Sequence, residues 1–185
     1  MPVSADLISA RAQQSLEVML RWAVQSRLVL QPDDTCTVTP ADVRPDADAA
    51  EGIVVVLTIS SMGFRFMLLL RCHDDAQTHA YFTRGGMAGA LREALLEVGN
   101  LCCGAINQDL VRHFPDLGMS TPYVLGAQSL RHVDSLKPDY RADFDVVIGT
   151  SVEMGVTMCL FTRVALDFVV GEDVTETSDG ELELF

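Results

Sequence analysis

Two neighbouring β-rich runs constrain the fold of this chain more than any other feature. Gly52 to Ile59 and Phe64 to Arg71 are separated only by Ser60 to Gly63, and this spacing predicts a β-hairpin. The cores of the two runs, IVVVLTI and FRFMLLL, are continuously apolar rather than alternating. Strands of this kind are apolar toward both faces, so we expect the sheet to be covered on much of both faces.

A first amphipathic helix is predicted upstream of the hairpin. Its apolar residues recur at helical spacing over residues 4–28, and Ser4 or Asp6 is suited to cap its start. The following segment is rich in Pro, Asp, Ala and Thr, and within it residues 35–39 predict a short edge strand. The helix therefore leads into the sheet through a loop-rich connection.

A second long helix is predicted from Met87 towards His113. Its broad apolar stripe includes Leu101, and two glycines, Gly99 and Gly104, interrupt it. A glycine inside a helix costs about 1 kcal/mol relative to alanine. Each glycine therefore needs a reason, which is either close packing or room for a partner.

A second hairpin is predicted from residues 144–152 and 156–168, with its turn at 153–155. The order helix, hairpin, helix, hairpin predicts an α+β fold in which two long helices pack on a mainly antiparallel sheet, and it suggests an internal pseudo-repeat. We expect one domain over residues 1–170. Residues 171–185 contain six acidic residues and no basic one, which predicts a flexible acidic tail.

Composition limits the partners of the chain. The 185 residues carry a formal net charge of −13, which argues against nucleic acid and anionic membrane as partners. No apolar run reaches the roughly 20 residues that span a bilayer, and the first residues lack the pattern of a signal peptide. The five cysteines and four histidines show no metal-ligand spacing. We therefore expect a cytoplasmic protein with reduced thiols and no metal site.

The candidate functional residues lie on the second helix. Glu97 and Asn100 are three residues apart, so both side chains leave the same face of the helix. A carboxylate can bind a cation on a partner, and an amide can hold a water by donating and accepting hydrogen bonds at once. The pair suits a protein that enters the active site of another protein and positions a nucleophilic water there.

This constellation resembles the CheC/CheX/FliY family of bacterial chemotaxis phosphatases, and CheX most closely. The family motif has a small or acidic residue, a Glu four positions on, an Asn three further on, and a Pro about 23 residues later. Glu93, Glu97 and Asn100 match the first three positions, and Pro122 falls 22 residues after Asn100. Gly104 matches a glycine that is commonly found one turn past the Asn.

The resemblance covers about residues 5–168 and implies a mechanism. Family members dephosphorylate the phosphoaspartate of a CheY-like response regulator. By resemblance, Glu97 would pair with the active-site lysine of the regulator, Asn100 would orient the attacking water, and Glu93 would belong to the docking face. The Mg²⁺ would be held by the regulator, so this chain would need no cofactor of its own.

Family members with two sites repeat Glu-x-x-Asn on the symmetry-related helix. In this chain Glu17 is the best counterpart, but Leu20 stands where the amide would be. The resemblance therefore implies one site, as in CheX-like proteins, which are commonly homodimers joined through sheet edges.

Two other interpretations stay open. The chain could be a non-catalytic binding or flagellar-switch-like scaffold module of the same fold. It could also be a structural homodimer with an incidental motif, in which case Glu97 and Asn100 would not face solvent together. Apart from any family, Glu97 and Asn100 could be ordinary polar residues of a helix surface, since polar faces are the rule on amphipathic helices.

Overall fold

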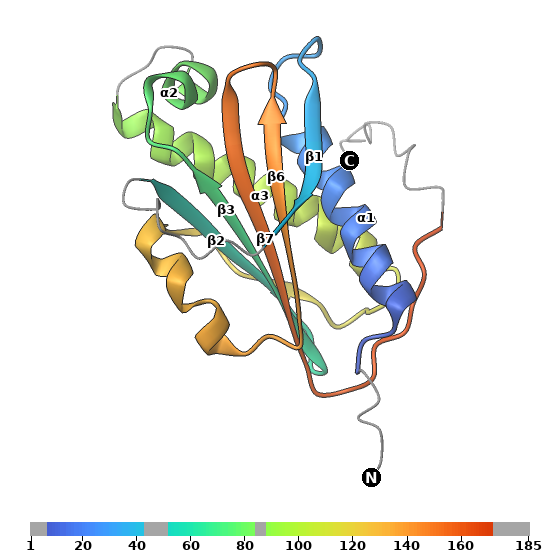
Figure 1. Cartoon of the computed structure of the whole chain (residues 1–185). Helices are drawn as coiled ribbons and strands as arrows, with labels where there is room; N and C mark the ends of the chain where they lie inside the picture. Colours follow the sequence, from blue (N-terminus) through green and yellow to red (C-terminus); the bar gives the residue numbers. More distant parts are fainter. Residues whose placement is uncertain (1–6, 43–51, 84–87, 172–185) are drawn as a thin grey trace, which may run out of the picture.

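One antiparallel sheet, with its two long helices packed on one face, organises the computed structural model, which describes residues 7–42, 52–83 and 88–171 (Figure 1). The strands follow the order β1-β6-β7-β3-β2-β4, and β5 also pairs with β2. The helices are α1 (Ala10–Arg27), α2 (Ala76–Thr83) and α3 (Ala88–Leu110), with two 3₁₀ helices η1 (Ala127–His132) and η2 (Asp134–Leu136). The strands are β1 (Cys36–Ala41), β2 (Ile53–Ser60), β3 (Phe64–Cys72), β4 (Gly118–Met119), β5 (Tyr123–Gly126), β6 (Tyr140–Ile148) and β7 (Val152–Thr162). The predicted α+β class is confirmed, while the internal pseudo-repeat and the division at residue 170 stay predictions.

The predicted first hairpin is confirmed as β2 and β3, which pair in register from Ile53↔Cys72 to Ser60↔Arg65. Alternate residues point to opposite faces. One set belongs to the main core beneath α1 and α3, and the other set, which includes Val54 and Val56, packs with Leu130 and Val133 of the 3₁₀ segment. Covering on both sides explains why these two strands are continuously apolar. The 3₁₀ segment itself has no clear sequence periodicity and was not predicted.

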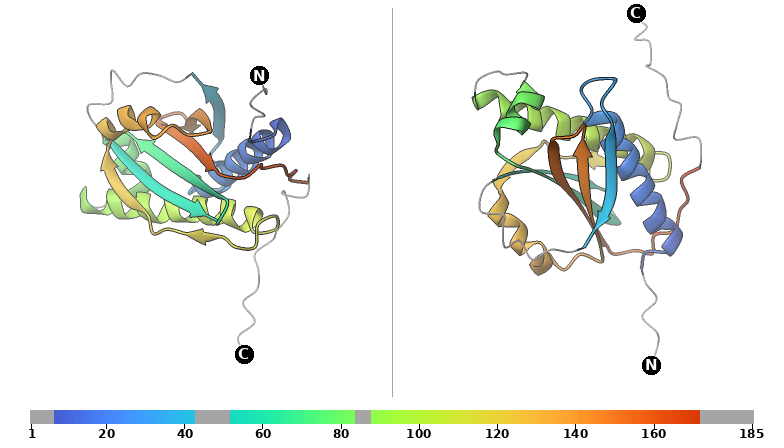
Figure 2. Two further views of the ribbon diagram at one scale, coloured as in Figure 1. Left: turned by 90° about the horizontal axis from the view of Figure 1, so that it is seen from below. Right: turned by 45° about the horizontal axis from the view of Figure 1, so that its top comes forward.

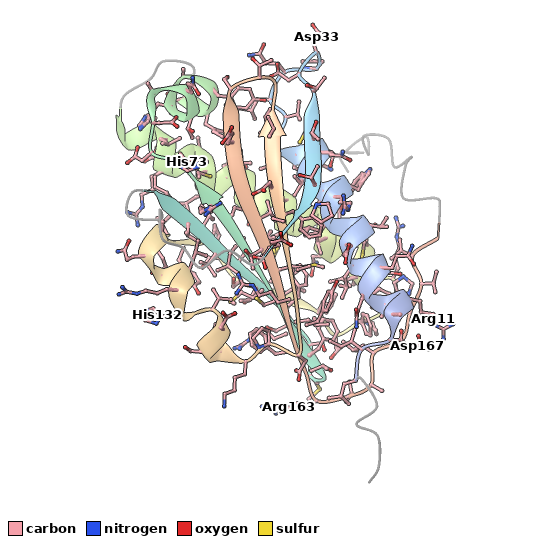
Figure 3. All side chains as sticks on the ribbon, viewed as in Figure 1. Arg11, Asp33, His73, His132, Arg163 and Asp167 are labelled. Atoms are coloured by element: carbon pink, nitrogen blue, oxygen red, sulfur yellow. The ribbon has the colours of Figure 1, made fainter. Side chains whose placement is uncertain are left out.

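The first helix begins later than predicted. Ser9 is the N-cap of α1, and its side-chain oxygen accepts a hydrogen bond from the Ala12 N–H at 3.2 Å. The caps expected at Ser4 and Asp6 lie outside the described residues. Ser9 also donates to Asp167, which in turn accepts hydrogen bonds from Arg11. Figure 3 shows Arg11 and Asp167 together, and this contact ties the segment after β7 to the start of α1.

The predicted register of the second hairpin was wrong. The turn lies at residues 149–151, where Gly149 adopts a left-handed φ of 59°, and β7 already begins at Val152. Residues 153–155, expected to form the turn, lie inside β7. Gly155 pairs with Arg71 of β3, and a Cβ there would lie 2.9 Å from Arg71 Nε. Gly155, which lies in the segment predicted as the turn, instead makes room for the side chain of Arg71 from the neighbouring strand.

The edge strand β1 was expected over residues 35–39 and is confirmed. The Gly149 N–H donates to the Thr35 carbonyl, next to the point where β1 begins to pair with β6. Gln25 and Arg21 of α1 donate to the carbonyls of Cys36 and Val38. Pro40 has no N–H to offer. This edge is therefore largely closed to pairing with another strand.

Helix α3 packs against the sheet at Gly99, where the absence of a side chain allows close contact. A Cβ at Gly99 would lie 2.9 Å from Val55 Cγ1 and 3.2 Å from Leu57 Cδ1, whereas a Cβ at Gly104 would meet nothing within 4 Å. Gly99 therefore serves close packing within the fold. Nothing among the described residues requires the glycine at position 104.

We expect opposite effects from alanine at these two positions. Gly99→Ala should lower the free energy of unfolding by about 1–3 kcal/mol, because the new methyl forces β2 and α3 apart. Gly104→Ala should raise it by about 0.5–1 kcal/mol, because alanine favours the helix and meets open space. Urea unfolding of both variants measures the two changes. Equal effects of the two substitutions would contradict the close-packing role of Gly99.

Candidate functional site

The outer face of α3 is fixed by what its inner face contacts. Gly99 faces Val55 of β2, and successive residues turn by about 100° around the helix. At about 100° per residue, Glu93, Glu97 and Asn100 lie about 120°, 160° and 100° around the helix from Gly99. All three therefore leave the half of α3 that points away from the sheet, with Asn100 nearest its flank. Glu93 and Glu97 are exposed and Asn100 is half-buried. The structure thus brings together the three residues that the sequence analysis selected.

Neither Glu97 nor Asn100 serves the described fold through a polar contact. Within the described residues, neither side chain makes a hydrogen bond or an ion pair. Among these residues, the amide of Asn100 thus keeps its donors and its acceptor available, and the carboxylate of Glu97 keeps its charge available. The pair can bind a cation and a water side by side.

The neighbours of the pair leave room for a partner. One turn beyond Asn100, Gly104 leaves the backbone of the helix uncovered. Leu101, which the sequence analysis assigned to the apolar stripe, is 44% exposed beside the pair. An exposed leucine next to bare backbone and a carboxylate gives this face an apolar contact as well as a charge. The sequence alone did not show that Leu101 lies outside the core. Its exposure follows from the rotation of the helix, which is fixed by the contact of Gly99 with the sheet.

Pro122 lies on a segment that follows the same helix. β4 and β5 flank it, both pair with β2, and Ser120 exchanges two hydrogen bonds with Thr58, each of 2.9 Å. Val124 is the cross-strand partner of Val55, the residue beneath Gly99. Figure 2 shows this segment running beside α3. The structure therefore brings the predicted proline segment alongside the Glu97–Asn100 helix.

The corresponding acid on α1 has a different environment. Tyr140 of β6 donates its hydroxyl proton to Glu17 Oε1 at 2.6 Å, and Arg21 Nη2 lies 3.9 Å from Glu17 Oε2. Burial and the hydrogen bond to Glu17 both raise the pKa of Tyr140. Glu17 thus holds α1 to the sheet. Leu20, three residues on, is fully buried, which leaves this helix without an exposed acid–amide pair at that position.

The cysteines are all free thiols, as predicted. Cys36 is half-buried and the other four are buried. Burial raises the pKa of Cys72 and of Cys103 to about 12. In the described part of the chain, no group of three or more His, Cys, Asp or Glu residues is gathered to hold a metal ion. No helix in the same residues is long and apolar enough to cross a bilayer.

Comparison with known proteins gives a structural likeness only. No family model and no curated protein matches the sequence. A chain of the CheX–CheY–BeF₃–Mg²⁺ complex from Borrelia burgdorferi matches with a TM-score of 0.56 and 10% identity, over 80% of this chain and 97% of that one. A CheC-like chemotactic protein from Shewanella oneidensis MR-1 matches with a TM-score of 0.53 and 9% identity, over 80% and 95%. CheX from Vibrio vulnificus matches with a TM-score of 0.50 and 11% identity, over 79% and 96%.

These matches define the class of fold, an α+β domain with long helices on one antiparallel sheet. More particularly, the chain has the fold of CheX and CheC-like chemotaxis proteins. The matched chains are covered almost completely, so the likeness extends over their whole fold. The fold resemblance stated from the sequence is therefore confirmed.

If Glu97 and Asn100 serve a partner rather than the fold, replacing them should hardly change stability. We expect Glu97→Ala and Asn100→Ala each to change the free energy of unfolding by less than about 0.5 kcal/mol. As the matched control, Tyr140→Phe should lower it by about 1 kcal/mol or more, because it leaves the half-buried Glu17 carboxylate without its donor. Chemical denaturation compares the three variants. A marked loss of stability in Asn100→Ala would assign that side chain to the fold instead.

Proposed function

We propose that this chain is a phosphatase that accelerates dephosphorylation of the phosphoaspartate of a CheY-like response regulator. One observation carries the proposal: in a CheX-like fold, the acid–amide pair lies on the outward face of α3 and has no partner among the described residues. The solved complex from Borrelia burgdorferi contains both CheX and CheY. A cytoplasmic location is part of the same proposal.

The chemistry that we assign to the pair is positioning. Glu97 forms an ion pair with the active-site lysine of the regulator, and Asn100 enters the regulator site and orients a water in line with the phosphorus. The oxygen of the water bonds to phosphorus as the bond to the aspartyl oxygen breaks, which releases inorganic phosphate and a free carboxylate. The Mg²⁺ stays with the regulator. Catalysis by this chain is therefore orientation and electrostatics, as phosphoryl transfer allows.

The docking face suits a cationic target. Glu93 and Glu97 are one turn apart on the outward side of α3, so their charges add there. Leu101 and the uncovered backbone at Gly104 supply an apolar contact next to them. An apolar centre with charges around it is a common arrangement in protein interfaces. Glu93 tunes the charge of this face and does not touch the reacting atoms.

Substitutions of the pair separate catalysis from docking. Asn100→Ala should abolish the accelerated decay of a phosphorylated CheY-like regulator and largely preserve binding, because it removes only the group that holds the water. Glu97→Ala should weaken binding as well. The decay rate with Mg²⁺ present and the regulator affinity, each measured for wild type and both variants, give the two readouts. Gln108→Ala, an exposed position farther along α3, is the matched control.

The alternative is a non-catalytic binding or scaffold module that docks through the same face. In that case the wild type would bind a regulator without accelerating its decay, and Asn100→Ala would change only affinity. If neither Glu97→Ala nor Asn100→Ala changed decay or binding, the pair would be ordinary surface residues and the proposal would be wrong.

We also propose a homodimer, and the structure favours one sheet edge for it. The β1 edge is largely closed by Pro40 and by the hydrogen bonds from Arg21 and Gln25. The β5 strand at the opposite edge carries Tyr123 and Leu125, which are 48% and 39% exposed. Light scattering should give twice the chain mass, and Leu125→Glu should reduce it to the monomer. Leu136→Glu, at another exposed leucine, should leave the dimer intact, and a monomeric wild type would contradict the proposal.

A further inference from the structure

A hollow of about 400 Å³ lies where the β2–β3 turn meets the end of β7. Arg65 and Arg163 line it, together with Ser61 and the ring of Phe161. Figure 3 shows Arg163 at the lower end of the molecule. Arg65 belongs to the set of β3 side chains that face away from α3. The hollow is therefore separate from the Glu97–Asn100 face, and a ligand in the hollow would be independent of the proposed function.

Neither arginine of the hollow forms an ion pair within the described part of the chain. Within the described residues, no carboxylate lies within ion-pair distance of either guanidinium. Arg65 lies over the Phe161 ring, 4.7 Å from its centroid. Stacking of this kind uses the flat face of the guanidinium, so the N–H donors at its rim stay available for a carboxylate.

The polar groups around the arginines favour an anion as well. Ser61 Oγ accepts hydrogen bonds from the N–H groups of Gly63 and Phe64 at 3.0 and 3.1 Å, so its own proton is free to donate. Among the described residues that line the hollow, the one acid is Asp139, and its Oδ2 accepts from the Thr162 N–H at 2.8 Å. A backbone hydrogen bond therefore holds one of the two oxygens of the carboxylate that opposes the two arginines.

The spacing of the two arginines indicates what kind of anion would fit. Arg65 is the cross-strand partner of Phe161, and Arg163 lies two residues farther along the same chain. Diagonal neighbours in an antiparallel pair are about 7–8 Å apart. Carboxylates at alternate residues of an extended peptide are spaced by about 7 Å on one side. An acidic segment with period two therefore matches the hollow.

The chain itself contains such a segment. Asp179, Glu181 and Glu183 alternate with Gly180, Leu182 and Leu184 near the end of the sequence. These residues lie outside the described part of the chain, which ends at Gly171. From Arg163 to Gly171 the chain can run at most about 30 Å, whereas the stretches from Gly171 to Glu181 and to Glu183 can span up to about 33 Å and 40 Å. The alternating acids can therefore return to the hollow.

We propose that the acidic segment 172–185 binds this hollow in its own chain, with Glu181 and Glu183 on Arg65 and Arg163. Each ion pair at an exposed site is weak, so the affinity of the free segment would be low. Tethering compensates, because it holds the acids near the hollow at an effective concentration on the order of millimolar. Charge complementarity, spacing and reach together favour this occupant over an unrelated acidic peptide.

Nuclear magnetic resonance of the full chain tests the proposal. The double variant Glu181→Gln with Glu183→Gln should move the side-chain Nε–Hε signals of Arg65 and Arg163 by more than their line widths. The matched control is Asp173→Asn with Glu176→Gln, which removes the same charge from the same segment and should leave these signals in place. Raising the salt to about 1 M, where the Debye length falls to about 3 Å, should reproduce the first result.

The reciprocal variant completes the test. Arg163→Gln should shift the backbone amide signals of residues 179–183, whereas Arg131→Gln, at an exposed arginine of η1, should not. The proposal would be overturned if neither tail variant moved the side-chain signals of Arg65 and Arg163. Equal shifts from the two tail variants would also overturn it, as would shifts that grow with protein concentration, since the latter would place the acids of a second copy in the hollow.

Discussion

The contact between Gly99 and the β2–β3 hairpin determines most of the arrangement on this side of the molecule. Because no Cβ separates α3 from Val55 and Leu57, the helix packs closely against the sheet there. This contact also fixes the rotation of α3 about its own axis. That rotation directs Glu97 and Asn100 outward and leaves Leu101 exposed. It also sets the helix beside the β4–β5 segment that contains Pro122. A buried glycine thus orients Glu97 and Asn100.

The sequence pattern was sufficient to predict a helix or strand where the spacing of apolar residues was clear. The continuous apolar runs identified β2 and β3, and helical spacing identified α1 and α3. The predicted turn of the second hairpin at residues 153–155 was wrong. Gly155 in this segment provides space for Arg71, and that role depends on a strand more than eighty residues away in the sequence. The start of α1 was also misplaced, because Ser9 is one of several residues able to cap it. Contacts of this kind are tertiary and leave no local pattern.

The candidate pair could be selected from sequence, but its availability could not. Spacing alone places Glu97 and Asn100 on one face, and it does the same for any Glu-x-x-Asn on a helix. The structure adds that their polar atoms are not used within the described fold, whereas Glu17 on α1 is bound by Tyr140. Two acids with similar sequence surroundings thus have different environments, one holding a helix to the sheet and the other facing solvent.

The four buried cysteines have a consequence for how the protein can be handled. A thiol reacts as its thiolate, and burial raises the pKa of Cys72 and of Cys103 to about 12, which disfavours the thiolate at neutral pH. These residues therefore act as small apolar side chains that oxidants and alkylating reagents reach slowly. Half-buried Cys36 is the exception among the five. With that position replaced, a single cysteine introduced on the surface would be the dominant site for a spectroscopic label.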